Sequence, residues 1–416
     1  MPTTSHEHDT LLARRQRALS PSYRLFYEEP IHAIRGEGVW IYDAEGRRYL
    51  DAYNNVPVVG HCHPHVVEQM VRQASVLNTH TRYLTDKPIE LAERLLGTMP
   101  PELGSVIFTN SGSEANDLAV RISRLVTGNS GIIVTDCAYH GTTDLLSGLS
   151  PVTGLPTGPG VFTVSLPLKM TDAAEFRVLV RGALDNMHEA GIKPAALLVD
   201  TIFGSDGAVS DPAGFLKDAV DDVRREGGLF IADEVQPGFG RTGAGMWGFA
   251  RHGVVPDIVT MGKPMGNGYP VASAVLRREL ADAFGRHQRY FNTFGGSTVG
   301  CVVALAVLDV IQNESLIAHA AETGAYLKDG LQNLCDRHDV FTDLRGTGLF
   351  LGVQTPSGDI AARIVNALRR AGVLIGAAGR GNAALKIRPP LPISRSDADY
   401  LIGTIEDVLS KDIEGA

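Results

Sequence analysis

Short apolar runs alternate with helical segments from about residue 64 to residue 300. Strands and helices that alternate in this way form a mostly parallel sheet with helices on both faces. The alternation therefore predicts an α/β domain whose ligand lies beyond the carboxyl ends of the strands. The helical segments include residues 114–126, 172–190 and 212–226, and the expected strands are residues 105–109, 131–135, 161–165, 196–200, 229–233 and 258–260.

A second pattern begins after about residue 300, where two long helices are expected before a set of shorter elements. This order predicts a smaller α+β domain. We expect three parts: an N-terminal segment (1–60) that contains a hairpin and joins the small domain, a large domain (61–300) and a C-terminal small domain (301–416). The hairpin is expected at 39–53, the helices at 297–312, 316–337, 359–371 and 394–410, and the later strands at 348–353, 373–376 and 384–388.

The composition argues against several classes of protein. The chain has 38 Lys and Arg residues and 47 Asp and Glu residues, which gives a net charge of −9. Proteins that bind nucleic acid usually carry a basic stretch, so nucleic acid is not an expected partner. The sequence has no run of about 18 uncharged apolar residues, so no membrane span is expected. The 4 cysteines lack CxxC and zinc spacing, which is typical of a reducing compartment. The N-terminus does not read as a secretory signal, and we expect a cytoplasmic protein.

One expected strand is followed by Asn110-Ser-Gly-Ser-Glu-Ala-Asn-Asp, which opens a helix. The free N–H groups of a first helical turn bind phosphate, and Gly112 allows a close approach. Ser111 and Ser113 add hydroxyl groups. An ordinary serine N-cap has the same residues, so this segment alone does not separate a phosphate site from a helix start.

Three more candidates follow strand ends. Asp233 ends one strand, where a buried carboxylate needs a cation such as a metal ion or a protonated ring nitrogen. Lys263 follows another, and burial there would lower the pKa of its amine and make it nucleophilic. Tyr139, beside His140, can stack on a flat ring, although each candidate also has a purely structural explanation. Together with the phosphate segment, these residues predict a pyridoxal phosphate site, in which the lysine forms a Schiff base and the aspartate keeps the pyridine nitrogen protonated.

Ten short motifs carry a family resemblance. They are Asp51-Ala-Tyr, Gly60-His-Cys-His-Pro, Asn110-Ser-Gly-Ser-Glu-Ala-Asn, Tyr139-His-Gly, Asp233-Glu-Val-Gln, Gly238-Phe-Gly-Arg-Thr-Gly, Gly262-Lys, Asn292-Thr-Phe-Gly-Gly-Ser, Arg345-Gly-Thr-Gly and Lys386-Ile-Arg-Pro-Pro. In combination they resemble the class III, or ω-type, aminotransferases, which are pyridoxal phosphate enzymes of fold type I. The resemblance runs from about Ile34 to Leu409. Within the family, it is nearest to the branch with alanine–glyoxylate aminotransferases and ethanolamine-phosphate phospho-lyases.

The resemblance implies a role for each site residue. Lys263 holds the cofactor and moves the substrate proton, and Asp233 pairs with the ring nitrogen. Arg388 grips a substrate carboxylate, with Tyr53 as a second substrate contact. The other implied cofactor contacts are Ser111, Gly112 and Ser113 at the phosphate, Tyr139 with His140 nearby, Val235 behind the ring, Gln236 at the phenolic oxygen, and Thr293 of a neighbouring subunit. A homodimer with shared active sites follows, and a tetramer is left open.

The implied reaction is transfer of an amino group from an amino acid or amine to a 2-oxo acid. Many relatives have a glutamate that neutralises the carboxylate-binding arginine, and Ser205 stands in its place here. A 4-aminobutyrate or ornithine enzyme is therefore not expected. The alternative is a phospho-lyase acting on a phosphorylated amine such as O-phosphoethanolamine, because Arg388 can bind phosphate as well as carboxylate.

Two further motifs admit other chemistry. His61-Cys-His-Pro-His65 could hold a metal ion, and Gly243-Ala-Gly-Met-Trp-Gly248 matches the glycine pattern of dinucleotide sites. The family uses the histidine segment structurally, and the glycine segment does not join a strand to a helix near the start of a βαβ unit. We therefore expect neither a metal ion nor a dinucleotide.

Overall fold

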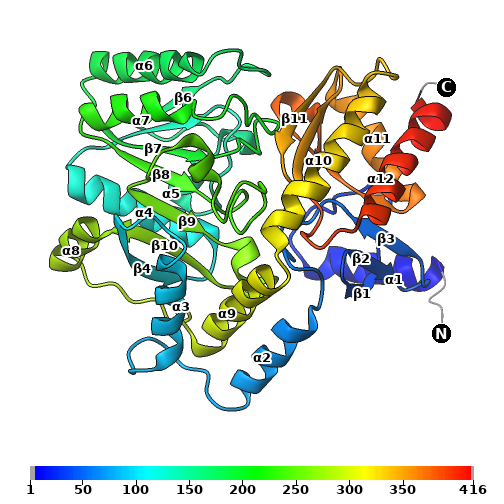
Figure 1. The fold of residues 1–416 in the computed structure, drawn as a ribbon, viewed down its shortest axis with the longest axis horizontal. Helices are drawn as coiled ribbons and strands as arrows, with labels where there is room; N and C mark the ends of the chain where they lie inside the picture. Colours follow the sequence, from blue (N-terminus) through cyan, green and yellow to red (C-terminus); the bar gives the residue numbers. More distant parts are fainter. Residues whose placement is uncertain (1–4, 414–416) are drawn as a thin grey trace.

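A computed structural model describes residues 5–413, which form a large part and a smaller part side by side (Figure 1). A seven-stranded sheet lies at the centre of the large part, in the order β4-β10-β9-β8-β7-β5-β6. Strands β5 to β9 pair in parallel, and β10 is antiparallel to both of its neighbours. This confirms the predicted α/β class. The strands are β4 (Leu103–Thr109), β5 (Gly131–Thr135), β6 (Val161–Val164), β7 (Pro194–Asp200), β8 (Leu229–Asp233), β9 (Ile258–Met261) and β10 (Ala272–Arg277).

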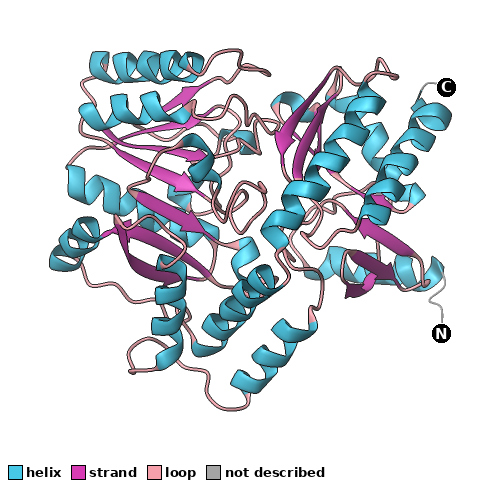
Figure 2. Ribbon diagram, in the orientation of Figure 1, coloured by secondary structure: helices cyan, strands magenta, loops and turns pink. Residues whose placement is uncertain are grey.

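Helices cover both faces of this sheet, as the ribbon in Figure 2 shows. Alternate residues of a strand point to opposite faces. Ile132 packs with α4 and α8, and its neighbour Ile133 packs in the cluster that contains α6 and α7. Because both faces are buried, the strands read as continuous apolar runs. These helices are α4 (Gly112–Thr127), α6 (Ala174–Glu189), α7 (Leu216–Arg225) and α8 (Arg278–His287), with the short α5 (Asp144–Ser147).

The smaller part contains two four-stranded sheets. One has the order β1-β2-β3-β13 and the other β11-β12-β15-β14. The first sheet joins distant parts of the chain, because β13 pairs in parallel with β3. Its strands are β1 (Ala33–Glu37), β2 (Trp40–Asp43), β3 (Arg48–Asp51) and β13 (Val373–Leu374). The second sheet is antiparallel and contains β11 (Asp343–Thr347), β12 (Phe350–Gln354), β14 (Gly376–Ala378) and β15 (Ala384–Ile387).

The expected hairpin is present between β2 and β3. The Asp43 carboxylate accepts hydrogen bonds from the backbone N–H groups of Glu45 and Arg47, and Gly46 has a φ of +83°. The strand predicted at 348–353 is present as β12, but it begins two residues later, because Gly348 turns the chain with a φ of +56° between β11 and β12. Strand β10 was not predicted, since it adds an antiparallel strand outside the βα alternation.

The remaining helices lie along both parts. They are α1 (Ser5–Ala18), α2 (Pro64–Ala74), α3 (Asp86–Leu96), α9 (Thr298–Asn313), α10 (Leu316–Cys335), α11 (Gly358–Ala371) and α12 (Arg395–Val408). Among the helices of residues 5–413, no single one is long and apolar enough to cross a membrane. Helices α9 and α10 reach that length and composition only as a pair bent by 62°.

Candidate active site

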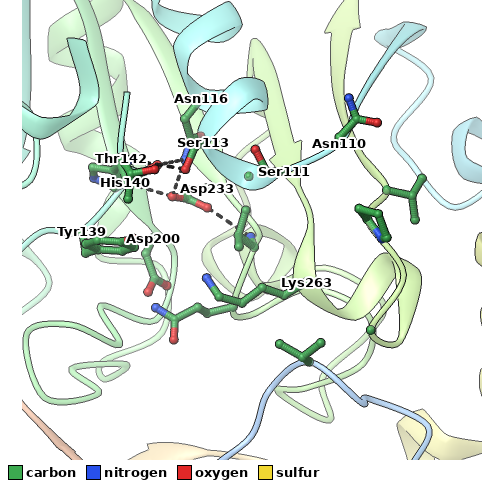
Figure 3. A pocket seen from close by; sticks show the side chains of 18 of the residues that line it. Asn110, Ser111, Ser113, Asn116, Tyr139, His140, Thr142, Asp200, Asp233 and Lys263 are labelled. Atoms are coloured by element: carbon green, nitrogen blue, oxygen red, sulfur yellow. Dashed lines mark hydrogen bonds and ion pairs between the residues drawn. The ribbon is translucent and has the colours of Figure 1, made fainter. Parts of the chain in front are cut away.

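A cavity of about 360 Å³ lies at the carboxyl ends of the large sheet, where the predicted strand-end residues meet (Figure 3). Its walls come from segments that follow β4, β5, β7, β8 and β9. Ligands of open α/β sheets bind at this edge. The predicted cofactor residues that line the cavity are Ser111, Gly112, Ser113, Tyr139, His140, Asp233, Val235, Gln236 and Lys263.

The start of α4 forms one end of the cavity. Ser111 caps the helix, because its hydroxyl accepts a hydrogen bond from the Glu114 N–H at 3.2 Å. A Cβ atom on Gly112 would lie 2.8 Å from Val235 Cγ2, so this close approach requires glycine. The Ser113 hydroxyl accepts from the Thr142 N–H at 3.2 Å. A helix N-terminus with two flanking hydroxyls and room against the backbone suits a phosphate group.

Asp233 also lines the cavity and is held in place by three donors. Its Oδ2 lies 2.8 Å from His140 Nδ1 and accepts from Asn116 Nδ2 at 2.9 Å, and its Oδ1 accepts from the Val235 N–H at 3.1 Å. The Thr260 hydroxyl donates to Asn116 Oδ1 and orients that amide. These contacts fix the carboxylate while leaving acceptor capacity on Oδ1, which suits a protonated ring nitrogen.

Lys263 begins the short 3₁₀ helix η3 (Lys263–Gly266), directly after β9. Its φ of +30° is unusual for a residue with a side chain, and such backbone strain is found mostly at functional sites. The side chain is open to the cavity, and protein surrounds the rest of it. Burial lowers the pKa of Lys263 below the ordinary lysine value, and Asp233 opposes this only in part. A lowered pKa makes the amine more nucleophilic.

The two walls between these ends suit a flat ring. Tyr139 follows β5 and lies on one side of the cavity, near Asp200 (Figure 3). Val235 also lines the cavity and lies against Gly112. The cavity therefore combines a phosphate site, a fixed carboxylate, a strained lysine, an aromatic side chain and an apolar one. This set of residues fits pyridoxal phosphate.

Arg388 and Tyr53 do not line this cavity. Arg388 lies behind Gln236, and its Nη1 donates to Gln236 Oε1 at 2.7 Å. The Arg388 guanidinium lies 5.1 Å from the centre of the Tyr53 ring, and its buried Nε has no hydrogen-bond partner. Thr293 lies on an exposed segment outside the cavity of its own chain.

The histidine motif does not converge. His61, His63 and His65 lie against three different carboxylates, those of Asp51, Glu314 and Asp309. The glycine motif lies in the loop between β8 and β9, where a Cβ on Gly243 would lie 2.7 Å from the Ala321 backbone of α10.

Sequence reasoning assigned no role to Asn116 or Asp200, although both line the cavity. Asp200 ends β7 as Asp233 ends β8, and the two are paired in register, so the strand-end signal could have found it. Asn116 is the last residue of the Asn110-Ser-Gly-Ser-Glu-Ala-Asn motif. Only the structure shows that this side of α4 turns toward Asp233.

The family model described as aminotransferase class-III matches residues 26–409. An alanine–glyoxylate aminotransferase 2 homolog of Arabidopsis thaliana is 38% identical and covers 99% of this chain and 89% of its own length. An ethanolamine-phosphate phospho-lyase homolog of Caenorhabditis elegans is 34% identical over 97% of this chain and 93% of its own. The solved structure of an Arthrobacter phospholyase in complex with phosphoethanolamine is 41% identical, with a TM-score of 0.92 over 96% of this chain and 99% of that one.

The comparisons correct one expectation. The Arabidopsis relative and two mammalian alanine–glyoxylate aminotransferases are named as mitochondrial proteins. The cytoplasmic location expected from the sequence is therefore wrong by this finding. The expectation rested on the polar N-terminus and on cysteine usage, and neither distinguishes the cytoplasm from another reducing compartment.

Proposed function

Since the chain belongs to the class III aminotransferases and has pyridoxal phosphate as its cofactor, we propose that Lys263 is the residue through which it moves amino groups to a 2-oxo acid. This proposal rests on one observation: Lys263, Asp233 and the N-terminus of α4 line the same cavity. The cofactor supplies an aldehyde that condenses with amines and a ring that withdraws electrons from the substrate carbon. The residues of the chain bind, orient and move protons.

Lys263 has two tasks in this proposal. Its Nζ would hold the cofactor, and the same amine would take a proton from the amine-bearing carbon of the substrate and return it. Both tasks need an uncharged amine, and burial lowers the pKa of Lys263 in that direction. Asp233 would hold the ring nitrogen of the cofactor and keep it protonated. His140 and Asn116 hold Asp233 in place for this.

The other proposed contacts orient the cofactor and the substrate. Ser111, Gly112 and Ser113 would bind the phosphate of the cofactor, and Tyr139, Val235 and Gln236 would hold its ring, with Gln236 at the phenolic oxygen. Arg388 binds the substrate anion after exchanging its hydrogen bond to Gln236, and Tyr53 lies beside it. No gating glutamate competes for Arg388, because position 205 is a serine.

We also propose that the active protein is a dimer in which Thr293 reaches the cofactor of the partner subunit. Phe294, next to Thr293, is 70% exposed and Leu84 is 94% exposed. The two segments are neighbours, since the Arg82 guanidinium lies 3.7 Å from the centre of the Phe291 ring. An exposed apolar patch of this kind supports a protein–protein interface. Sedimentation of the purified protein, with Leu84→Glu expected to give monomers, tests this proposal.

The function is tested by the visible absorption of the purified protein. L-alanine should bleach the band of the bound cofactor, and a 2-oxo acid should restore it. Turnover with L-alanine that does not depend on a 2-oxo acid would contradict the proposal.

A second candidate is elimination of phosphate from a phosphorylated amine. It is favoured by the 41% identity to the Arthrobacter phospholyase and by an arginine that no glutamate neutralises. Release of inorganic phosphate from O-phosphoethanolamine, with no 2-oxo acid present, would identify this reaction.

A further inference from the structure

A second buried cation lies beside Arg388. Lys386 and Arg388 are each 8% exposed; Lys386 lies in β15, and Arg388 directly follows the last residue of that strand, two positions further on. Alternate residues of a strand share one face. The Phe350 ring lies under both, 5.2 Å from Lys386 Nζ and 5.7 Å from the Arg388 guanidinium. The two cations therefore form one group on the face of the small sheet.

Glycines flank Lys386 on both neighbouring strands. In the register of the sheet, Lys386 pairs with Gly352 on β12 and with Gly376 on β14. A Cβ on Gly352 would lie 2.6 Å from the Gly207 carbonyl oxygen, and one on Gly376 would lie 2.8 Å from the Tyr53 ring. The absence of side chains at these positions leaves room for the Gly207 backbone and the Tyr53 ring beside the two strand positions that flank Lys386.

Carboxylates surround this group without forming an ion pair with it. Asp200 and Asp206 attract the Lys386 amine, which Arg388 and Lys263 repel, and Asp51 and Asp200 attract the Arg388 guanidinium. Both Asp200 oxygens accept backbone N–H groups, and burial raises the pKa of Asp206 to about 8, which favours its uncharged form at neutral pH. Among the ion pairs within residues 5–413, none joins a carboxylate to Lys386 or Arg388.

We propose that Lys386 and Arg388 form a two-cation subsite for the phosphate group of a phosphorylated amine. Buried cations without an ion-pair partner are costly, and an anion that binds between them recovers that cost. A carboxylate is satisfied by one arginine, whereas a phosphate monoester carries close to two charges and three acceptor oxygens at neutral pH. Lys386 is thus the residue that selects phosphate over carboxylate. The inference rests on the proposed function, because the amine end of the same substrate reacts at Lys263.

The subsite also accounts for the fate of such a substrate. When the phosphate is on the carbon next to the amine-bearing carbon, Lys263 removes a proton from the latter. The bond from carbon to the phosphate oxygen then breaks, and phosphate leaves with the bonding electron pair. Addition of water releases ammonia and an aldehyde. The balance requires one water molecule and neither an oxidant nor a 2-oxo acid.

Calorimetric titration of the holoenzyme with inorganic phosphate tests the subsite without turnover. The cofactor's own phosphate fills the α4 site, so the Lys386 subsite is the one that remains. We expect Lys386→Met to weaken phosphate binding by about 10- to 100-fold, the loss of one charged hydrogen bond. Lys386→Arg should restore binding, and Lys217→Met, at an exposed lysine of α7, should leave it as in the wild type. Equal binding by wild type and Lys386→Met would overturn the inference.

The spectral response to two substrates separates this inference from the proposed function. We expect the ratio of apparent affinities for O-phosphoethanolamine and L-alanine to fall at least about 10-fold in Lys386→Met. Equal losses for both substrates would indicate a structural role and contradict the subsite. If the wild type responds to L-alanine but not to O-phosphoethanolamine, the subsite is contradicted and the proposed function is not. If the protein responds to neither substrate, both proposals are contradicted.

The pH dependence gives a third readout. Burial and Arg388 lower the pKa of Lys386 well below the ordinary lysine value. Only the protonated amine binds phosphate strongly, so phosphate affinity should decrease as the pH rises through that pKa. Arginine stays charged throughout, so Lys386→Arg should show a flatter profile. A wild-type profile identical to that of Lys386→Arg would count against the subsite.

Discussion

The two halves of the active site are built in different ways. The cofactor half lies at the ends of parallel strands, where Asp233 has three hydrogen-bond donors and Ser111 caps a helix. The substrate half lies on the antiparallel small sheet, where Lys386 and Arg388 are buried and, among the ion pairs of the described residues, neither is joined to a carboxylate. Buried polar groups with all their hydrogen bonds are rigid and stabilise the fold. Buried cations without an ion-pair partner are costly, and a bound anion reduces that cost. The Asp233 carboxylate of the cofactor half is therefore fixed before any ligand binds, whereas the cations of the substrate half gain an ion-pair partner only when an anion binds.

The largest effect is expected at the reacting amine of the cofactor half. Lys263→Ala should lower the rate of the L-alanine half-reaction by at least about 10³-fold, because it removes both the covalent attachment and the proton carrier. Stopped-flow absorbance of the cofactor band measures that rate. Lys193→Ala, at an exposed lysine on another part of the large domain, is the matched control. Full turnover by Lys263→Ala would refute the whole assignment of the cavity.

A smaller loss is expected at the fixed carboxylate. Asp233→Asn keeps the shape of the side chain but removes the charge that holds the ring nitrogen protonated. The half-reaction should slow by about 10²-fold or more, the usual effect of removing one preorganised electrostatic contact. Asp221→Asn, at an exposed carboxylate of α7, should change nothing. If Asp233→Asn kept the wild-type rate, the carboxylate would serve only to hold His140 and Asn116.

Two glycine-to-alanine substitutions compare a tightly packed position of the cofactor half with an open position on a surface helix. In Gly112→Ala, the new methyl group would lie 2.8 Å from Val235 Cγ2, so Val235 must shift where it would face the cofactor ring. We expect cofactor affinity to fall by about 10-fold, the usual cost of an overpacked contact. Gly182→Ala in α6 meets nothing within 4 Å and should instead raise the free energy of unfolding by about 0.5–1 kcal/mol. Fluorescence titration with pyridoxal phosphate and thermal unfolding measure the two effects. If Gly112→Ala kept the wild-type affinity for pyridoxal phosphate, Val235 could move away from the new methyl group without weakening cofactor binding.

The same contrast explains what could be predicted from the sequence. Strand-end residues such as Asp233 and Lys263 follow apolar runs, so a local pattern placed them together at one edge of the sheet. The substrate half is assembled from Tyr53, the Asp200–Gly207 segment and β15, which are far apart in the chain. The environment of Lys386 depends on the register that places Gly352 and Gly376 opposite it, and no local pattern encodes that register. The resemblance supplied Arg388 but gave Lys386 no role.

The smallest effect concerns the stability of the substrate half. Burial raises the pKa of Asp206 from 3.8 to about 8, so between these values the folded protein binds more protons than the unfolded chain. Stability that comes from this group must then decrease as the pH rises from about 4 toward 8. Asp206→Asn has no such proton and should show a flatter dependence of the urea midpoint on pH. Asp221→Asn should keep the wild-type slope, because its carboxylate is exposed. Parallel profiles for wild type and Asp206→Asn would mean that Asp206 stays ionised, and Lys386 would then have a charged neighbour that weakens the case for an anion beside it.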